Sequence, residues 1–393
     1  METPMKPICI IPARGGSKGL PRKNVLPLCG RPLLAWNVMA AVEAYGGDSV
    51  FVTTDDTEIA KVAITYGARV IMRPAQLAED NSSSEDALIH ALQEICEQNG
   101  SLPEKFLFLQ CTSPLTAAQD IRAIMETMEG SQADSAFSAT PSHRFLWRPD
   151  DNGNAAGVNH DSRIRLRRQD CDPEYSENGA IYAMRTEGFL KNKHRFFGKT
   201  VVHEMPEERS WEVDSPTDFA VAEILLGNRI SMEKFQLLPS KIEAVIFDFD
   251  GVMTDNRVTT DQHGNESVAC DRSDGMGISK LRESGIRLLV LSTEENPVVA
   301  ARCSKLKIEC IHGQSDKAAR LRQWLKEEQI NPENTVYLGN DINDTGCLDI
   351  VGCPVVVADA YSEAKQHALI VLEMPGGKGA VRELCDLILN GSR

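Results

Sequence analysis

Three features are scarce or missing in this sequence of 393 residues, and each absence argues against a class of protein. The eleven scattered cysteines include no CxxC pair, which argues against a zinc site or a disulfide framework and for reduced thiols. No apolar run approaches the ~18–20 residues that cross a bilayer. Positive charge is in deficit, at a formal net charge of -15, which argues against broad binding to nucleic acid or to membrane surfaces.

The remaining composition is typical of packed globular domains. Hydrophobic residues make up 42% of the chain, and its length predicts two or three domains of ~100–200 residues each. The opening stretch, METPMKPICIIPARGG, has only a short apolar run before charge and glycine follow, unlike a signal peptide. The sequence contains no fixed-period repeat, low-complexity tract or heptad pattern. We therefore expect a cytoplasmic protein without a membrane or nucleic-acid partner.

Short apolar runs alternate with amphipathic stretches over two successive parts of the chain. The first series includes PICII, SVFVTT, RVIMR and KFLFLQ as strands, and it closes with a serine-capped helix in SPTDFAVAEILLG. The pattern restarts with IEAVIFDFDG, RLLVLST, TVYLGN and CPVVVAD. Alternation of this kind predicts mainly parallel sheets covered by helices on both faces. We predict an α/β protein with two Rossmann-like three-layer domains, at 1–229 and 242–393, joined by a connector at 230–241.

A glycine-rich loop follows the first predicted strand. The stretch PARGGSKGLPRKN, residues 12–24, holds four cations, Arg14, Lys18, Arg22 and Lys23, in an otherwise acidic chain. Glycines allow the backbone N–H groups to approach a phosphate, and lysine and arginine neutralise phosphate oxygens. Because ligands of open parallel sheets bind past the carboxyl ends of the strands, this loop is placed to hold a small phosphorylated ligand.

Residues 6–226 resemble the acylneuraminate cytidylyltransferases. The resemblance rests on IIPARGGSKGLPRKNVLPLCGRPLLAW, RPAQLAEDNSSSEDALIHAL, FLQCTSPL, RRQDCDPEYSENGAIYAM, RFFGKTVVHEM and WEVDSPTDF, in the order and spacing of that family. It implies a nucleotide-diphospho-sugar transferase-like fold and transfer of CMP from CTP to a free nonulosonic acid, with release of pyrophosphate. By this resemblance the triphosphate would be held by Arg14, Lys18, Lys23 and Asn24, and the nucleotide would be contacted by Arg73 and Ser83. The sugar would be contacted by Gln110, Arg168, Asn178, Tyr182, Phe196 and Phe197.

Two details of this resemblance bear on metal binding and on packing. The stretch WEVD places Glu212 and Asp214 on one face of an extended segment, at the positions of the family's Mg²⁺-binding acidic pair. Glu212 stands where the family more often has aspartate, and Cys111 replaces the proline usual after the glutamine. The aromatic residues in the predicted sugar pocket could instead belong to a packed core, and this less favoured alternative stays open.

The second half carries a different set of motifs, each at the end of a predicted strand or the start of a helix. Asp248 and Asp250 end the strand in FDFDG, and Ser292 ends the next. SDKAARL supplies Lys317, and LGNDINDTG supplies Asp341 and Asp344. This order resembles that of haloacid dehalogenase-type phosphatases.

The resemblance assigns each residue a role. Asp248 would be the nucleophile and Asp250 the acid and base. Mg²⁺ would be held by Asp248, the Asp250 carbonyl and Asp341, and the phosphate would be gripped by Ser292 and Lys317. Asp344 would orient a neighbour.

Further stretches resemble the 3-deoxy-octulosonate 8-phosphate and nonulosonate 9-phosphate phosphatases. They are DGVMTDNRV, DGMGI, LSTEENPVV, GNDINDTGCL and PGGKGAVREL, within residues 242–390. The stretch NRVTTDQHGNESVAC predicts only a hairpin in place of a large cap. Small-cap members form tetramers, so the resemblance implies a homotetramer. Glu294 follows the phosphate-binding Ser-Thr pair where relatives acting on octulosonate phosphate commonly have arginine, and this favours a nine-carbon sugar phosphate.

The two halves together predict a bifunctional enzyme. The second domain would dephosphorylate a nonulosonate 9-phosphate, and the first would activate the free sugar, of sialic acid or KDN type, with CTP. Two alternatives stay open. The second domain could be a silent tetramerisation module, as in vertebrate cytidylyltransferases, although Asp248, Asp250, Lys317 and Asp341 are all present. The first domain could act on octulosonate, although RGGSKGLPRKN favours the sialic-acid branch.

Overall fold

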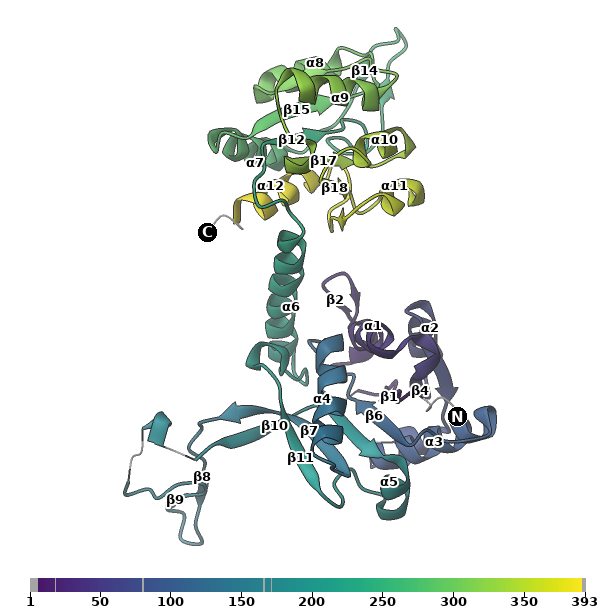
Figure 1. Cartoon of the computed structure of the whole chain (residues 1–393), viewed down its shortest axis with the longest axis vertical. Coiled ribbons are helices and arrows are strands. Elements are labelled where there is room, and N and C mark those ends of the chain that lie inside the picture. The colour runs from purple at the N-terminus through teal and green to yellow at the C-terminus, as the bar shows by residue number, and fades with distance from the viewer. Residues whose placement is uncertain (1–5, 18, 80, 165–166, 171, 391–393) are drawn as a thin grey trace. The chain divides into compact units, whose positions relative to one another are not determined.

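A computed structural model of the chain describes residues 6–17, 19–79, 81–164, 167–170 and 172–390. It divides into two compact units, Met1–Gly227 and Asn228–Arg393. Both units are α/β, as predicted (Figure 1). Helix α6 (Pro216–Gln236) contains the boundary between the units, so the predicted connector begins as helix. The predicted serine cap of α6 is confirmed, because Ser215 Oγ accepts a hydrogen bond from the Asp218 N–H at 3.2 Å.

The first unit is built on a seven-stranded sheet in the order β11-β7-β10-β6-β1-β4-β5. Only β10 runs antiparallel to its neighbours, so the prediction of a mainly parallel sheet is confirmed. Its strands are β1 (Ile8–Pro12), β4 (Val50–Thr54), β5 (Arg69–Met72), β6 (Lys105–Leu109), β7 (Ser135–Ser142), β10 (Glu174–Arg185) and β11 (Thr200–Glu204).

Helices cover both faces of this sheet. Alternate residues of β1 divide between two cores: Cys9 and Ile11 pack with one helix group, and Ile8 and Ile10 with the other. The first group is α1 (Leu33–Tyr45), α2 (Thr57–Thr65) and α4 (Ala118–Gly130); the second is α3 (Ser84–Asn99) and α5 (Thr186–Asn192). Two short strands, β2 (Pro27–Leu28) and β3 (Arg31–Pro32), form a ribbon before α1.

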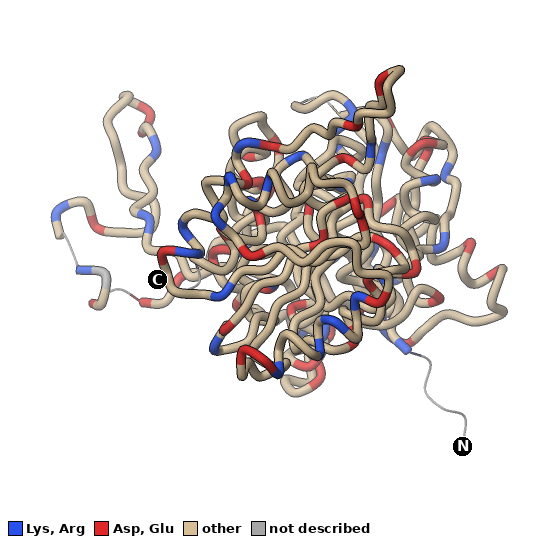
Figure 2. Tube along the Cα trace, turned by 90° about the horizontal axis from the view of Figure 1, so that it is seen from above, with Lys and Arg blue, Asp and Glu red and all other residues tan. Residues whose placement is uncertain are grey.

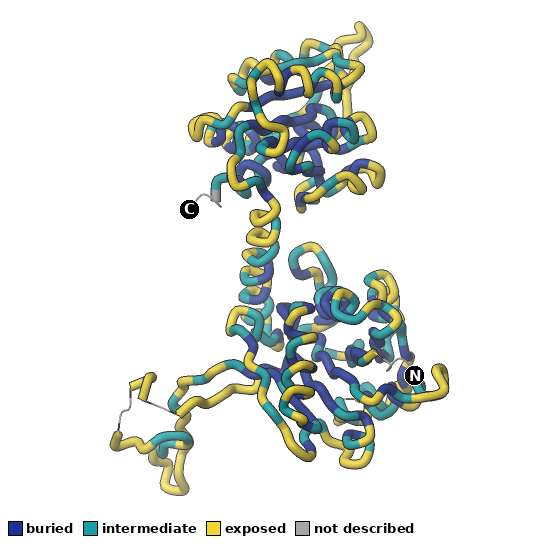
Figure 3. The backbone as a smooth tube through the Cα atoms, in the orientation of Figure 1, coloured by how far each residue is buried: buried dark blue, intermediate teal, exposed yellow. Residues whose placement is uncertain are grey.

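An arm that we did not predict projects from this sheet. The ladder between β7 and β10 continues outward as far as the pair Ser142 and Glu174, and the small hairpin of β8 (Trp147–Pro149) and β9 (Ala155–Gly157) follows. Most of the arm is exposed (Figure 3). The Ser, Ala, Thr and Pro residues of β7 give no strong apolar alternation, which is why this strand escaped the sequence analysis.

The second unit is built on a six-stranded parallel sheet in the order β16-β15-β12-β17-β18-β19. Its strands are β12 (Ala244–Phe247), β15 (Arg287–Leu291), β16 (Glu309–Ile311), β17 (Thr335–Gly339), β18 (Cys353–Val356) and β19 (Ile370–Val371). Its helices are α7 (Arg272–Glu283), α8 (Val298–Leu306), α9 (Lys317–Glu327), α10 (Thr345–Leu348), α11 (Ser362–Gln366) and α12 (Ala380–Asn390). The predicted hairpin is confirmed as β13 (Thr259–Thr260) and β14 (Glu266–Ser267).

Acidic and basic residues are interspersed along the trace of the chain (Figure 2). Among the described residues, no helix has the length and apolar character needed to cross a membrane.

Candidate active sites

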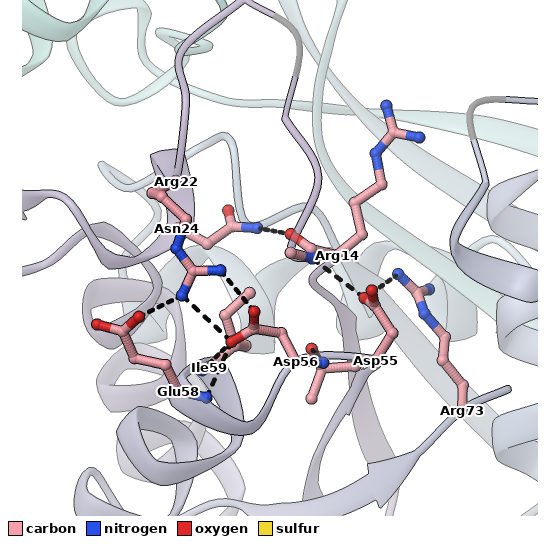
Figure 4. Close-up of polar contacts among 10 residues, drawn as sticks. Arg14, Arg22, Asn24, Asp55, Asp56, Glu58, Ile59 and Arg73 are labelled. Carbon is pink, nitrogen blue, oxygen red and sulfur yellow. Dashed lines mark hydrogen bonds and ion pairs between the residues drawn. The ribbon is translucent and has the colours of Figure 1, made fainter. Parts of the chain in front are cut away.

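Side chains bind the main chain of the basic loop after β1, one from outside the loop and one from within it. The Gly15 N–H donates to Asp55 Oδ1 at 3.0 Å, and Asn24 Nδ2 donates to the Arg14 carbonyl at 3.0 Å (Figure 4). A Cβ at Gly19 would lie 2.2 Å from the Asp214 carbonyl oxygen, so only glycine allows this approach. The loop therefore packs directly against the segment that carries the predicted acidic pair.

Arg22 stabilises the loop from the side. Its guanidinium forms ion pairs with Asp56 and Glu58 in the first turn of α2, whereas the Arg14 side chain extends away from that cluster (Figure 4). The hydrogen bond from Arg22 lowers the pKa of Asp56 to about 2. Asp56 also caps α2, so Arg22 attaches the loop to the start of this helix.

The predicted nucleotide residues meet at one cavity of about 350 Å³. It lies past the carboxyl ends of β1 and β6, as expected for a parallel sheet. Eight of the predicted residues line it: Arg14, Lys23, Asn24, Arg73, Ser83, Gln110, Glu212 and Asp214. Lys18 lies outside the described residues.

Two buried polar atoms on residues that line this cavity, Arg73 Nε and Asn24 Oδ1, have no hydrogen-bond partner among the described residues. Arg73 is 8% exposed, its Nε is unpaired, and burial lowers the pKa of its guanidinium. Its NH2 lies 4.0 Å from Asp55 Oδ1. Asn24 is 5% exposed, and its Oδ1 has no donor. Because unpaired buried polar atoms are costly, this wall is suited to a polar ligand.

The acidic pair and Lys23 form the opposite wall. Lys23 Nζ donates to the Val213 carbonyl at 2.7 Å and pairs with Asp214 at 3.0 Å. Glu212 Oε1 accepts from Thr112 Oγ1 at 3.1 Å. Burial and then the neighbouring Asp214 raise the pKa of Glu212. Two carboxylates on one extended segment are hard oxygen donors that fit Mg²⁺.

The predicted sugar residues divide among several places. Gln110 lines the nucleotide cavity, and Phe196 lines a second cavity of about 470 Å³. Tyr182 does not line this cavity but is buried in the core, at 2% exposure. Phe197 packs in the same core beside Gly188. The Asn178 side chain is buried and bonded to Ser138 and Ser210. Arg168 starts a short 3-10 helix in the arm, and its side chain lies outside the described residues.

The second cavity contains polar residues that the sequence analysis missed. Its lining consists of Ser83, Glu85, Glu177, Lys193, His194, Arg195 and Phe196. These residues come from α3, from β10 and from the loop after α5, which are far apart in the sequence. Glu85 and Arg195 lie within two of the stretches that carry the family resemblance, SSSEDALIHAL and RFFGKTVVHEM, but the sequence analysis assigned a role to neither.

In the second unit, the predicted residues follow the carboxyl ends of neighbouring strands. Asp248 directly follows β12, the third strand in the sheet order, and Ser292 follows β15 on one side of it. Asp341 follows β17 on the other side, and Lys317 begins α9. Lys317 Nζ lies 2.8 Å from Asp248 Oδ1, which brings two of the predicted residues into direct contact.

Asp344 binds several residues around this site through its buried carboxylate. Its carboxylate accepts from Lys317 Nζ at 2.6 Å, from the Tyr337 hydroxyl at 2.7 Å and from the Asn340 N–H at 2.8 Å. Asp344 is fully buried, and these contacts support the expected orienting role. A Cβ at Gly339 would lie 2.6 Å from Asp344 Oδ2, so glycine is needed at this close approach.

The carboxylates at this site carry more negative charge than Lys317 offsets. Burial, and then Asp344, raise the pKa of Asp248 to about 7, although Lys317 opposes this. Burial, and then Glu294, raise the pKa of Asp250. For Lys317, burial alone would lower the pKa, but Asp248 and Asp344 outweigh burial and raise it.

Such a surplus of oxygen donors and negative charge fits a divalent cation. Asp248, Asp341 and the Asp250 main chain are the predicted ligands. Across the described residues, no three His, Cys, Asp or Glu side chains gather as a complete metal site. Both predicted Mg²⁺ sites would therefore draw further oxygens from main chain, ligand or water.

Comparison with known proteins finds a family match in each unit. Residues 8–227 match the family described as Cytidylyltransferase, and residues 290–384 match the family described as haloacid dehalogenase-like hydrolase. The second unit is also similar to a solved 3-deoxy-D-manno-octulosonate 8-phosphate phosphatase from Yersinia pestis. That match has 34% identity and a TM-score of 0.38, and it covers 41% of this chain and 85% of that one.

Full-length relatives cover both units at once. The chain is 33% identical over 393 residues to N-acylneuraminate cytidylyltransferase A of Danio rerio, covering 97% of this chain and 88% of that protein. It is 32% identical over 389 residues to N-acylneuraminate cytidylyltransferase of Oncorhynchus mykiss, with the same shares covered. The cation-lined cavity and its acidic pair agree with this similarity. Because the similarity extends over nearly the full length, the chain belongs to the N-acylneuraminate cytidylyltransferase family.

Proposed function

We propose that the first unit transfers CMP from CTP to a free nonulosonic acid. One observation carries this proposal: residues far apart in the sequence converge on a single cavity that is lined by the cations Arg14, Lys23 and Arg73 and by the acidic pair. Cations suit a triphosphate, and the carboxylates suit the metal that accompanies it. The names of the full-length relatives support the same reaction.

Within this cavity, Arg14, Lys23 and Asn24 bind the triphosphate, and Arg73 and Ser83 contact the nucleoside. Glu212 and Asp214 would hold Mg²⁺, which would neutralise charge on the phosphate oxygens. Lys23 already contacts Asp214, so it lies where triphosphate and acidic pair meet.

The reaction is an in-line displacement at the α-phosphorus. The anomeric hydroxyl of the sugar forms the new P–O bond, and the bond to the β-phosphate oxygen breaks to release pyrophosphate. Because the protein contributes chiefly alignment and charge stabilisation, the residues that contact the phosphate oxygens contribute most to the rate. Gln110 and the second cavity lined by Phe196 orient the sugar.

Lys23→Ala tests this assignment, with Arg22→Ala as its matched control. Lys23 lines the cavity, whereas Arg22 is engaged with α2. We expect Lys23→Ala to lower kcat/KM for pyrophosphate release by about a hundredfold, the loss of a charged phosphate contact at the reacting centre, and Arg22→Ala to stay within about threefold. Unchanged activity in Lys23→Ala would refute the proposed triphosphate site.

For the second unit we propose hydrolysis of a nonulosonate 9-phosphate. Asp248 attacks phosphorus to form an aspartyl-phosphate, and Asp250 protonates the leaving alkoxide and then deprotonates the attacking water. Ser292 and Lys317 bind phosphate oxygens. Asp248, Asp341 and the Asp250 carbonyl would hold Mg²⁺, which would offset repulsion between carboxylate and phosphate. The raised pKa of Asp250 supports its role as the acid.

Glu294 would contact the sugar end of this substrate. Its N–H donates to Ser292 Oγ at 3.0 Å, so it adjoins the proposed phosphate site. Under this proposal the second unit supplies the free sugar that the first unit activates. A homotetramer and a cytoplasmic location remain predictions from the sequence.

A phosphorus NMR experiment with Mg²⁺, CTP and a panel of nonulosonate 9-phosphates tests both activities. Orthophosphate should form before pyrophosphate and CMP-sugar. Asp248→Asn should abolish orthophosphate release and leave CMP transfer to free sugars intact. If the wild-type chain released no orthophosphate from any member, the second unit would be a scaffold or would act on another substrate.

A further inference from the structure

The lining of the second cavity of the first unit includes an ion pair to which the sequence resemblance assigned no role. Arg195 binds Glu85 in a bidentate manner, through Nε at 2.7 Å and NH2 at 3.2 Å. Their side chains are only 16% and 14% exposed. Because a partly buried bidentate pair has little geometric freedom, it fixes the loop after α5 against the first turn of α3.

The same guanidinium lies over two stacked aromatic rings. Its carbon is 4.6 Å from the centroid of Tyr182 and 5.1 Å from that of Phe108, and the two rings stack at 5.2 Å with an interplanar angle of 17°. The Tyr182 hydroxyl donates to Glu177 Oε1. Glu85, Arg195, Tyr182 and Glu177 therefore form one continuous network, which we call the cavity network.

The cavity network also adjoins the nucleotide cavity. Ser83 lines both cavities and caps α3, because its Oγ accepts from the Asp86 N–H at 3.1 Å. Glu85 lies two residues further along the same turn, and Phe108 lines the nucleotide cavity. A ligand in the second cavity would thus lie beside the nucleotide.

The chemistry of the second cavity suits a neutral chain of hydroxyl groups. Glu177 lies at the cavity with a carboxylate that accepts hydrogen bonds, and Phe196 offers an aromatic wall for C–H groups. Glu85 neutralises Arg195, so the guanidinium acts chiefly by holding the rings and the loop in place.

We propose that Glu177 and Arg195 determine sugar specificity in the first unit, with Glu177 accepting hydrogen bonds from sugar hydroxyls and Arg195 positioning Tyr182 and the loop. This inference rests on the proposed CMP transfer. It adds residues to the sugar site that the sequence resemblance did not assign.

The test measures initial rates of pyrophosphate release by the full chain with Mg²⁺, varying N-acetylneuraminic acid and CTP separately. Glu177→Gln keeps the shape and removes the charge. Arg195→Lys keeps the charge and removes the bidentate geometry. We expect the KM for the sugar to rise about ten- to a hundredfold in either variant, while the KM for CTP stays within about twofold.

Arg185→Lys is the matched control. Arg185, the last residue of β10, also pairs with a glutamate, Glu104 at 2.8 Å, but the two side chains are 37% and 70% exposed and do not line the second cavity. We expect both KM values to be unchanged. Thermal melts check that each variant is folded, and Glu177→Gln, at an exposed position, decides the question if Arg195→Lys unfolds.

The outcomes separate this inference from the proposed function. If the wild-type chain turns over but Glu177→Gln leaves the KM for the sugar unchanged, the inference alone is overturned. The same holds if Glu177→Gln changes the KM for the sugar and the KM for CTP equally. Absence of pyrophosphate release by the wild-type chain with N-acetylneuraminic acid, its deaminated analogue and legionaminate would overturn both.

Discussion

The buried triad of Lys317, Asp248 and Asp344 makes a sharp prediction about stability. Lys317→Met removes the charge at nearly constant length. In the wild-type chain, Lys317 Nζ lies 2.8 Å from Asp248 and 2.6 Å from Asp344. The three side chains are 1%, 4% and 0% exposed. The substitution therefore leaves two buried carboxylates without their cation.

The expected cost is large because water cannot replace the lost partner. Breaking a buried ion pair costs about 3–5 kcal/mol, whereas an exposed pair contributes about 0–1 kcal/mol. Arg320→Met is the matched control on the same helix, because Arg320 pairs with Glu327 at 3.2 Å and their side chains are 24% and 48% exposed. The difference of about 3 kcal/mol corresponds to about a hundredfold in an opening equilibrium.

The cost should also depend on pH, with a definite sign. The folded-state pKa of Asp248, about 7, lies above its ordinary value of 3.8. Protonated Asp248 therefore contributes to the free energy of unfolding. This contribution is fully present below about pH 4 and is lost as the pH rises through about 7. Lys317 lowers this pKa, so its removal raises the pKa further. Lys317→Met should therefore destabilise the second unit more at pH 8 than at pH 5.

Hydrogen exchange with mass spectrometry on the full chain measures this locally. Peptides covering β12 and β17 report opening of the second unit, and peptides covering β1 and β6 report the first unit as an internal reference. We expect about a hundredfold faster exchange in the former peptides of Lys317→Met at pH 8. Equal exchange in Lys317→Met and Arg320→Met would refute the argument from buried charge.

Three further predictions concern other parts of the chain. Because the pKa of Glu212 is raised, protons compete with Mg²⁺ for this carboxylate at pH values above the usual range for glutamate. The Mg²⁺ concentration needed for pyrophosphate release should therefore rise as the pH falls, and Glu212→Gln should make that concentration less dependent on pH. Gly251→Ala should abolish orthophosphate release but keep pyrophosphate release, because φ is +77° and the new Cβ would lie 1.9 Å from Asn340 Nδ2. Ser215→Ala removes the contact with Asp218 that caps α6 and should cost about 1 kcal/mol in thermal unfolding.

Much of the fold and of both candidate sites could be predicted because their signals are local. A buried apolar run followed by a charged or glycine-rich segment marks the carboxyl end of a strand. In a parallel sheet such ends lie on one edge. This reasoning correctly places the basic loop after β1 and Asp248 after β12. It failed for β7, whose small and polar residues carry no clear period.

By itself, the sequence determined the two α/β units, the order of their motifs and the residue types available for catalysis. Only the tertiary structure decided which partners these residues have. Arg22, within the cation-rich loop, turns to Asp56 rather than to the nucleotide cavity, and Arg195 meets Glu85 across 110 residues. The physical reason is that a periodic pattern specifies which face of an element is buried. Which side chain from a distant element becomes its partner depends on how the two elements pack, and no local sequence pattern specifies that packing.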